Sequence, residues 1–266
     1  MISFTLFKRE CKGLWKIMLI FGSVLTLYIS MIISMYEPEM QKSLDEIVKL
    51  MPGIMDALGL AAGSATLSGY ISSYLYGFLM IVFPMAFSIL SAHKLIAGYV
   101  DRGSMASLLA APVRRSTVAF TQMKVIASGI FTLIFYCSIL EIAVSEISFP
   151  GKLDIPRILL LNLGLFCLHL FIAGICFFCS CFFSDAKYSI AFGAGIPTVE
   201  YIVRMLANTG GSAEKAQYLT FFSLFHPDGI IAGNVGSMGG IVILFFGAVG
   251  LFAVSLIVFS KRDLHI

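Results

Sequence analysis

Several ionisable residues lie inside long apolar stretches of this 266-residue chain. Glu141 lies within the apolar run 122–145, and Glu200 and Arg204 lie within the run 188–207. A charged group in such surroundings is costly, so each of the three is a candidate functional residue. Glu200 and Arg204 are four residues apart and can pair on one helix face, lining a path, locking two helices or lying near water at a helix end. Glu141 can meet a cationic substrate or a basic partner.

No set of residues typical of catalysis or of metal binding is visible. Cys176 and Cys179 share a helix face and could hold a soft metal. No histidine or acid nearby completes such a site, which favours small apolar packing residues instead. His169 lies in the middle of the run 157–183 without a second ligand, and it can hydrogen-bond between helices. We therefore expect no metal site and no catalysis by this chain.

The composition indicates what surrounds these residues. Hydrophobic residues make up 59% of the chain and charged residues 12%, whereas soluble domains carry about 25% charged residues. The mean hydropathy of +0.95 agrees with burial in lipid. A net charge of +3 is too small to indicate a nucleic-acid partner. The six cysteines lie mostly in apolar runs, so we expect no disulfide on the outer side.

The apolar runs predict an all-α polytopic membrane protein with six transmembrane helices in one domain, 1–266. Outer segments 37–69, 146–156 and 208–238 connect these spans. No inverted repeat of the kind found in secondary carriers is visible. The expected spans are about 17–36, 70–92, 122–145, 157–183, 188–207 and 239–260.

Basic residues predict the orientation of these spans. Lys and Arg are enriched in the cytoplasmic segments of membrane proteins. If both termini are inside, the outer segments hold only Lys42, Lys49, Lys152, Arg157 and Lys215. We therefore expect both termini to be cytoplasmic, in a multi-pass protein of the cell membrane. The inner segments then hold Lys8, Arg9, Lys12, Lys16, Lys94, Arg102, Arg114, Arg115, Lys124, Lys187, Lys261 and Arg262.

The N-terminal residues 1–16 predict an amphipathic helix at the membrane interface. Basic residues cover its other faces, and Trp15 and Lys16 follow as anchors where the chain turns into the membrane. Such a helix lies among lipid headgroups, so membrane lipid is an expected partner. The alternative is a frayed start of the chain. Its predicted apolar stripe is Phe4, Phe7, Cys11 and Leu14.

The two long outer segments predict short surface helices. In 37–69 apolar residues recur at helical spacing, and Pro52-Gly53 divides them into two short helices that pack against the bundle or act as a lid. The stretch 208–238 is rich in Gly and Ser, and its apolar patch predicts a surface or partly re-entrant element.

The inner connection 93–121 predicts a short helix between the second and third spans. Ser104 can cap it, and Pro112 ends it. Met105, Leu108 and Leu109 would form one apolar face. Such a helix can dock into a groove of a soluble partner, or lie on the membrane surface.

The same connection resembles a known family. Asp101-Arg-Gly103-Ser104, followed by Leu108-Leu109-Ala-x-Pro112-Val-x-Arg115, resembles permeases of the type-2 ATP-binding-cassette class. Their loop has an acidic residue, Gly-Thr, Leu-Leu, a small residue, Pro and Arg. Here Asp101 replaces a common Glu and Ser104 a usual Thr. The ending Phe259-Ser-Lys-Arg-Asp-Leu264 and the six spans also fit that class.

The resemblance implies a permease domain over the whole chain that works with other subunits. Two permeases would pair, as copies or sisters, and a coupling helix at about 101–111 would dock on a cytoplasmic ATPase. ATP and Mg would bind that ATPase, and a hydrophobic or amphipathic cargo, such as a peptide antibiotic or drug, would leave a bacterial cell. This chain has no Gly-x-x-x-x-Gly-Lys-Ser/Thr phosphate loop of its own. The docking residues implied are Asp101, Gly103, Ser104, Met105, Leu108, Leu109, Pro112 and Arg115.

A different class of function stays open beside this one. A gradient-driven carrier or a channel would need no ATPase, and the acidic residues inside the spans allow it. The loop that resembles a coupling helix and the absence of a visible repeat favour the ATP-driven exporter.

Overall fold

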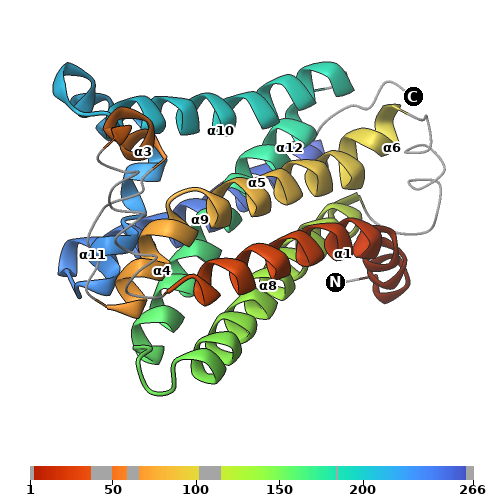
Figure 1. Cartoon of the computed structure of the whole chain (residues 1–266). Helices are drawn as coiled ribbons and strands as arrows, with labels where there is room; N and C mark the ends of the chain where they lie inside the picture. Colours follow the sequence, from red (N-terminus) through yellow and green to blue (C-terminus); the bar gives the residue numbers. More distant parts are fainter. Residues whose placement is uncertain (1–2, 37–49, 59–65, 102–114, 184, 262–266) are drawn as a thin grey trace.

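The computed structural model describes residues 3–36, 50–58, 66–101, 115–183 and 185–261 (Figure 1). Within these residues every regular element is a helix. The long helices are α1 (Phe4–Ser34), α8 (Arg115–Ser148), α9 (Ile155–Phe182), α10 (Ala186–Asn208) and α12 (Val235–Lys261). The short elements are α3 (Pro52–Ala57), α4 (Leu67–Tyr76), α5 (Leu79–Ala92), η1 (His93–Ala97), α6 (Gly98–Asp101), η2 (Gly211–Leu219), η3 (Phe221–Leu224) and α11 (Pro227–Ile231).

The long helices confirm a membrane-embedded, all-helical protein. Five helices of the described chain, α1, α8, α9, α10 and α12, are long and apolar enough to cross a membrane. The predicted second span is not straight, because α4 and α5 meet at a bend of 43°. Gly77 and Phe78 separate the two helices, and Gly is a poor helix former. If this bent pair is one span, the spans number six.

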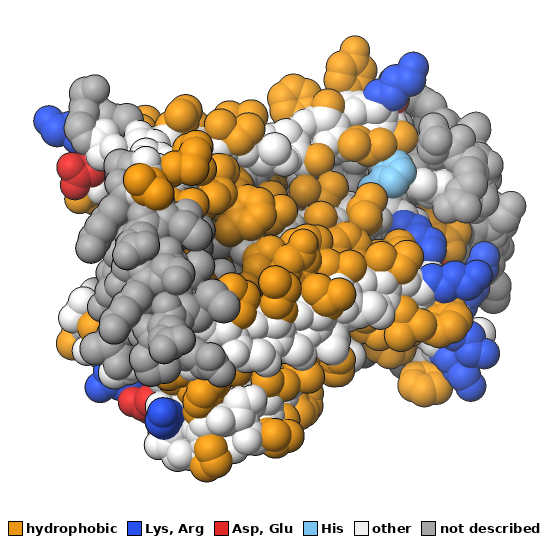
Figure 2. All heavy atoms as spheres, in the orientation of Figure 1, with side chains coloured by type: hydrophobic (Ala, Val, Ile, Leu, Met, Phe, Trp, Pro, Cys, Tyr) orange, Lys and Arg blue, Asp and Glu red, His pale blue; other side chains and the backbone are white. Residues whose placement is uncertain are grey.

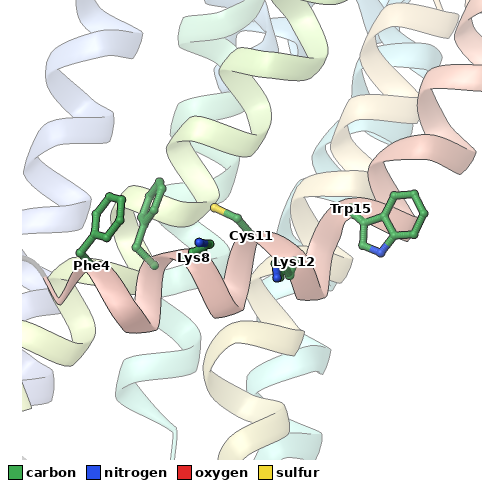
Figure 3. A pocket seen from close by; sticks show the side chains of 6 residues that line it. Phe4, Lys8, Cys11, Lys12 and Trp15 are labelled. Atoms are coloured by element: carbon green, nitrogen blue, oxygen red, sulfur yellow. The ribbon is translucent and has the colours of Figure 1, made fainter.

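The amphipathic start of the chain is continuous with the first span. Residues Phe4–Ser34 form one unbroken helix, α1, rather than two elements. The helix changes direction near Trp15, so its first part runs across the ends of other helices (Figure 3). Leu6, Glu10 and Leu14 of this part are buried. Of the predicted stripe, Leu14 is buried, whereas Phe4 is exposed.

Helix α9 is the centre of the bundle. Of its apolar window 67% is buried, against 28% for α12 and 17% for α1. It packs against α5, α8, α10 and α12. Small residues let these helices approach closely, as is common in membranes. A Cβ atom on Gly174 of α9 would lie 3.1 Å from Leu251 Cβ of α12, for example.

The segments predicted to lie on the outer side form short elements where they are described, and in 208–238 these are η2, η3 and α11. Pro52 begins α3 and Pro227 begins α11, which suits the first turn of a helix, where no N–H is needed. The rest of the predicted helical pair in 37–69 lies largely outside the described residues.

Charge is distributed unevenly over the two ends of the bundle. Figure 2 shows blue Lys and Arg side chains gathered at the end where both termini lie, and an orange apolar belt across the middle. The opposite end carries acids and bases together. The orientation of the spans was predicted from an uneven distribution of Lys and Arg of this kind.

Two adjacent glycines in α12 test how this helix packs against η3. A Cβ atom on Gly240 would collide with the backbone carbonyl oxygen of Leu224, whereas a Cβ on the adjacent Gly239 would meet nothing within 4 Å. We expect Gly240→Ala to destabilise the protein by about 1–3 kcal/mol, because backbone must move. Gly239→Ala should be neutral or slightly stabilising, since Ala favours helix. Thermal unfolding of both variants in detergent checks this, and equal stabilities would contradict the packing of α12 on η3.

Candidate functional site

Most of the residues predicted to dock an ATPase lie in a segment outside the described residues. Asp101 is the last residue of α6 and Arg115 is the first residue of α8. The remaining six predicted docking residues lie between them, outside the described residues: Gly103, Ser104, Met105, Leu108, Leu109 and Pro112. What the structure does describe is how both flanks of this loop are held.

The first part of α1 binds both flanks of the loop. Tyr99 of α6 donates a hydrogen bond to the buried carboxylate of Glu10. Lys94 Nζ in η1 donates to the carbonyl oxygen of Gly13 at 2.6 Å. On the other flank, the backbone N–H of Ser3 donates to Thr121 Oγ1 of α8 at 3.1 Å. A displacement of the loop would therefore reach α1, α5 and α8 together.

The entry to the loop has an unusual helical geometry. Residues His93–Ala97 form a π-helix between α5 and α6. A π-turn inserts an extra residue into the helical repeat, and such turns are frequent at functional sites. It rotates the following residues, including Tyr99, relative to an uninterrupted α-helix.

The outer surface of the same part of α1 carries a groove. Phe4, Phe7 and Trp15 line it together with Lys8 and Lys12 (Figure 3). Phe4 is 76% exposed and Trp15 is 49% exposed. The acid of this segment, Glu10, points inward, so the exposed charges around the groove are basic. Exposed aromatic rings beside basic groups are typical of a helix among lipid headgroups.

Glu141 is not isolated in the structure. It is completely buried in α8, and its Oε2 accepts two hydrogen bonds. Tyr76 Oη donates at 2.8 Å and Asn162 Nδ2 donates at 2.9 Å. Neither of the described residues that bind it is basic. Instead the carboxyl group joins α4, α8 and α9 at one point.

A polar stripe runs along α9 toward the other end of the bundle. Asn162, His169 and Cys176 are spaced seven residues apart, which places them on one helix face. His169 Nε2 lies 2.9 Å from the carbonyl oxygen of Met80, and since a carbonyl only accepts, Nε2 carries the proton. Cys176 Sγ donates to the carbonyl oxygen of Gly193 at 3.1 Å.

Prolines explain why those two carbonyl oxygens need donors. Pro84 lies four residues after Met80, and Pro197 lies four residues after Gly193. A proline has no N–H, so the carbonyl four residues earlier loses its helical partner. In an apolar interior such an oxygen must be satisfied by another group. His169 and Cys176 supply the missing donors from α9, which fixes α5 and α10 to it.

Glu200 and Arg204 do not form the pair that their spacing predicts. Glu200 Oε2 accepts the backbone N–H of Phe221 at 3.1 Å. The Arg204 guanidinium lies over the ring of Phe222, 5.9 Å from its centre, and its Nη1 is enclosed without a partner. Both side chains therefore hold η3 against α10, which favours a locking role.

The turn at His226 lies beside this cluster. Burial lowers the pKa of His226, and the positive charge of Arg204 lowers it further, so the ring is neutral at neutral pH. Asp228 accepts a hydrogen bond from Ser72 Oγ of α4 at 2.8 Å. The predicted turn is thus also an attachment point for α4.

The cysteine cluster does not form a metal centre. Within the described part of the chain, no three His, Cys, Asp or Glu side chains could hold a metal ion. None of the six cysteines forms a disulfide among the described residues, and Cys176 is engaged by a carbonyl oxygen.

Sequence reasoning missed Tyr76, Asn162 and the two freed carbonyl oxygens. A signal for them existed in the seven-residue spacing along α9 and in the two prolines within apolar runs. The sequence does not indicate which helices would meet, so the partners stayed unknown.

Comparison with known proteins gave no match: no family model, no curated protein and no solved structure matches the chain.

A double-mutant cycle tests the link between His169 and Pro84. We expect His169→Leu to cost about 1–3 kcal/mol, because the Met80 oxygen is left without a donor. In a Pro84→Ala background the restored N–H can bind that oxygen, so His169→Leu should cost less. The matched control is Pro197→Ala, which should leave the cost of His169→Leu unchanged. Denaturant or thermal unfolding in detergent measures all variants, and additive effects in the Pro84→Ala background would contradict the explanation.

Trp15 is the single tryptophan of the chain and reports the depth of the amphipathic segment. We expect its fluorescence in vesicles to be quenched more by lipids brominated near the headgroup than by lipids brominated near the chain end. The reason is that a flat amphipathic helix lies at the headgroup boundary. A control protein with Trp15→Phe and Tyr28→Trp should show the opposite order, since residue 28 lies further along the span. Deep quenching of Trp15 would contradict an interfacial position.

Proposed function

We propose that this chain is the membrane subunit of an ATP-binding-cassette exporter. The observation that carries the proposal is the attachment of the first part of α1 to both flanks of the loop 102–114. Glu10 and Gly13 bind the entry of the loop, and Ser3 binds its exit. A loop held in this way is suited to receive a force from a soluble partner and pass it to the bundle.

The charge distribution supports the same arrangement. The loop leaves and re-enters the bundle at its basic end (Figures 1 and 2). Basic segments face the cytoplasm in membrane proteins, so the loop and both termini are cytoplasmic in this proposal. That is the side on which an ATPase and its nucleotide would be available.

Energy reaches the bundle through the helices that flank the loop. In the proposed mechanism, ATP binding moves the ATPase and with it the coupling helix at about 101–111. The motion passes through α6 and η1 to α5, and through α8 to Glu141 and the outer end. The bend between α4 and α5 gives one span a place to change its shape. ATP and Mg stay on the partner chain, because this sequence contains no phosphate loop.

A second permease, a copy or a sister, completes the proposed path. Exposed apolar side chains on α1, α10 and α12 suit both lipid and another permease. The cargo in this proposal is hydrophobic or amphipathic, such as a peptide antibiotic or a drug-like molecule. Cargo, outward direction and a role in immunity rest on the resemblance of the loop and the tail to type-2 permeases.

The second candidate is a gradient-driven carrier without an ATPase. The observation that favours it is the buried carboxyl group of Glu141, which lies inside the bundle with one oxygen unpartnered. Acids at such positions serve as ion or proton sites in carriers. The two candidates differ in whether a soluble ATPase binds the chain.

Co-purification with the ATPase of the neighbouring reading frame tests the proposal. We expect the tagged wild-type permease to retain the ATPase in gentle detergent. A variant with Asp101→Ala, Leu108→Ala and Leu109→Ala should lose it, because both the acid and the apolar face of the docking helix are removed. As a control, the wild-type permease and the triple variant must insert into the membrane at equal levels.

A matched variant at the opposite end controls for general damage. Met51→Ala, Ile54→Ala and Asp56→Ala also remove one acid and two large apolar side chains, all of them exposed. This variant should retain the ATPase. If the wild type retains no ATPase, the exporter proposal fails and the carrier is the function to test.

A further inference from the structure

The two carboxyl oxygens of Glu141 have different surroundings. Oε2 accepts from Tyr76 Oη at 2.8 Å and from Asn162 Nδ2 at 2.9 Å. Oε1 is equally buried and has no hydrogen-bond partner among the residues that the structure describes. A buried polar atom without a partner is uncommon and costs free energy, so this asymmetry needs an explanation.

A second unpartnered acceptor belongs to the same pair of side chains. Asn162 is 4% exposed, and its Oδ1 has no partner although its Nδ2 binds Glu141. A carboxylate oxygen and an amide oxygen can only accept hydrogen bonds. Two acceptors on hydrogen-bonded neighbouring side chains therefore lack a donor among the described residues. A single proton on Oε1 would turn one of them into a donor.

Among the described residues, no Lys or Arg side chain acts on Glu141 to stabilise its ionised form. The titratable groups that face it within the described chain are Tyr76 of α4 and Cys137, one turn earlier on α8. Around them α1, α5 and α12, over residues 17–34, 79–92 and 236–260, contain no Lys, Arg, His, Asp or Glu. The further polar neighbours are Ser145, Asp228 bound to Ser72 on α4, and His169 two turns along α9. A buried carboxylate without a counter-charge is strongly disfavoured.

We infer that Glu141 carries a proton on Oε1 and forms a cyclic acid–amide pair with Asn162, so that this point of the bundle is a proton-binding site. In this pair Asn162 Nδ2 donates to Oε2 and the carboxylic O–H donates to Oδ1. Tyr76 adds a second donor to Oε2. Every donor and acceptor of the two planar groups on their facing edges is then satisfied.

The site lies where the bundle can change shape. Tyr76 is the last residue of α4, directly before the 43° bend that separates it from α5. On the same face of α4, Ser68 accepts the N–H of Asp154 and Ser72 donates to Asp228. A movement of α4 that admits water would break the Tyr76 bond and let the proton leave. Proton occupancy and the position of α4 are therefore linked, with or without an ATPase.

The direct test is the infrared spectrum of purified protein at neutral pH. A protonated carboxylic acid absorbs at higher frequency than a carboxylate. We expect an acid band in the wild type that is lost in Glu141→Gln and shifted in Asn162→Leu, which removes the amide partner. Glu146→Gln on the same helix is the matched control and should keep the band. Absence of an acid band from the wild type would overturn the inference.

Stability gives an independent readout with a defined sign. The unfolded chain ionises Glu141 at ordinary acidic pH, whereas the folded protein keeps the proton, so the wild type should lose stability as pH rises. Glu141→Gln should melt at a temperature that changes less with pH, and should be at least as stable as the wild type at alkaline pH. If sodium ions raise the melting temperature of the wild type at alkaline pH but not that of Glu141→Gln, the site holds a metal cation and the inference is wrong. Should Glu141→Gln fail to fold, the pH titration of the wild-type acid band decides alone.

Discussion

The constraint on which this structure depends is that each backbone carbonyl in an apolar interior must receive a hydrogen bond. Two prolines, Pro84 and Pro197, each remove the helical donor for the carbonyl four residues earlier. His169 and Cys176 replace those donors, and both belong to α9. The helix that is most deeply buried is thus also the helix that completes the hydrogen bonding of its neighbours. The prolines inside α5 and α10 are accommodated because both helices pack against α9.

Two further groups of polar contacts lie at the two ends of the bundle. At the basic end, three hydrogen bonds attach the first part of α1 to the flanks of the loop 102–114. At the opposite end, Ser68, Ser72 and Tyr76 attach one face of α4 to three other elements. Apolar contacts between helices permit sliding, whereas these bonds specify one position. The bundle therefore has a fixed central helix and two polar attachments where its shape can be controlled.

Three polar side chains along α9 each have a structural reason. Asn162 binds an acid, His169 a carbonyl and Cys176 another carbonyl. Glu141 differs from these three, because it is a completely buried acid and one oxygen of its carboxyl group has no partner among the described residues. A buried acceptor of this kind marks a place where a small ligand, in our inference a proton, completes the structure.

The sequence by itself determined the helical, membrane-embedded class, the positions of the long helices and the uneven charge of the two ends. These follow from local properties: apolar runs of sufficient length, prolines and glycines between them, and the counts of Lys and Arg. The bend at Gly77 and the continuity of α1 through Trp15 were not predicted, because both depend on packing around them. The tertiary structure alone decided which polar groups meet. The spacing of Glu200 and Arg204 allowed a pair, yet each found a closer partner in η3. The seven-residue stripe of α9 can be seen in the sequence, but its partners come from helices up to about ninety residues away, and only the relative rotation of packed helices selects them.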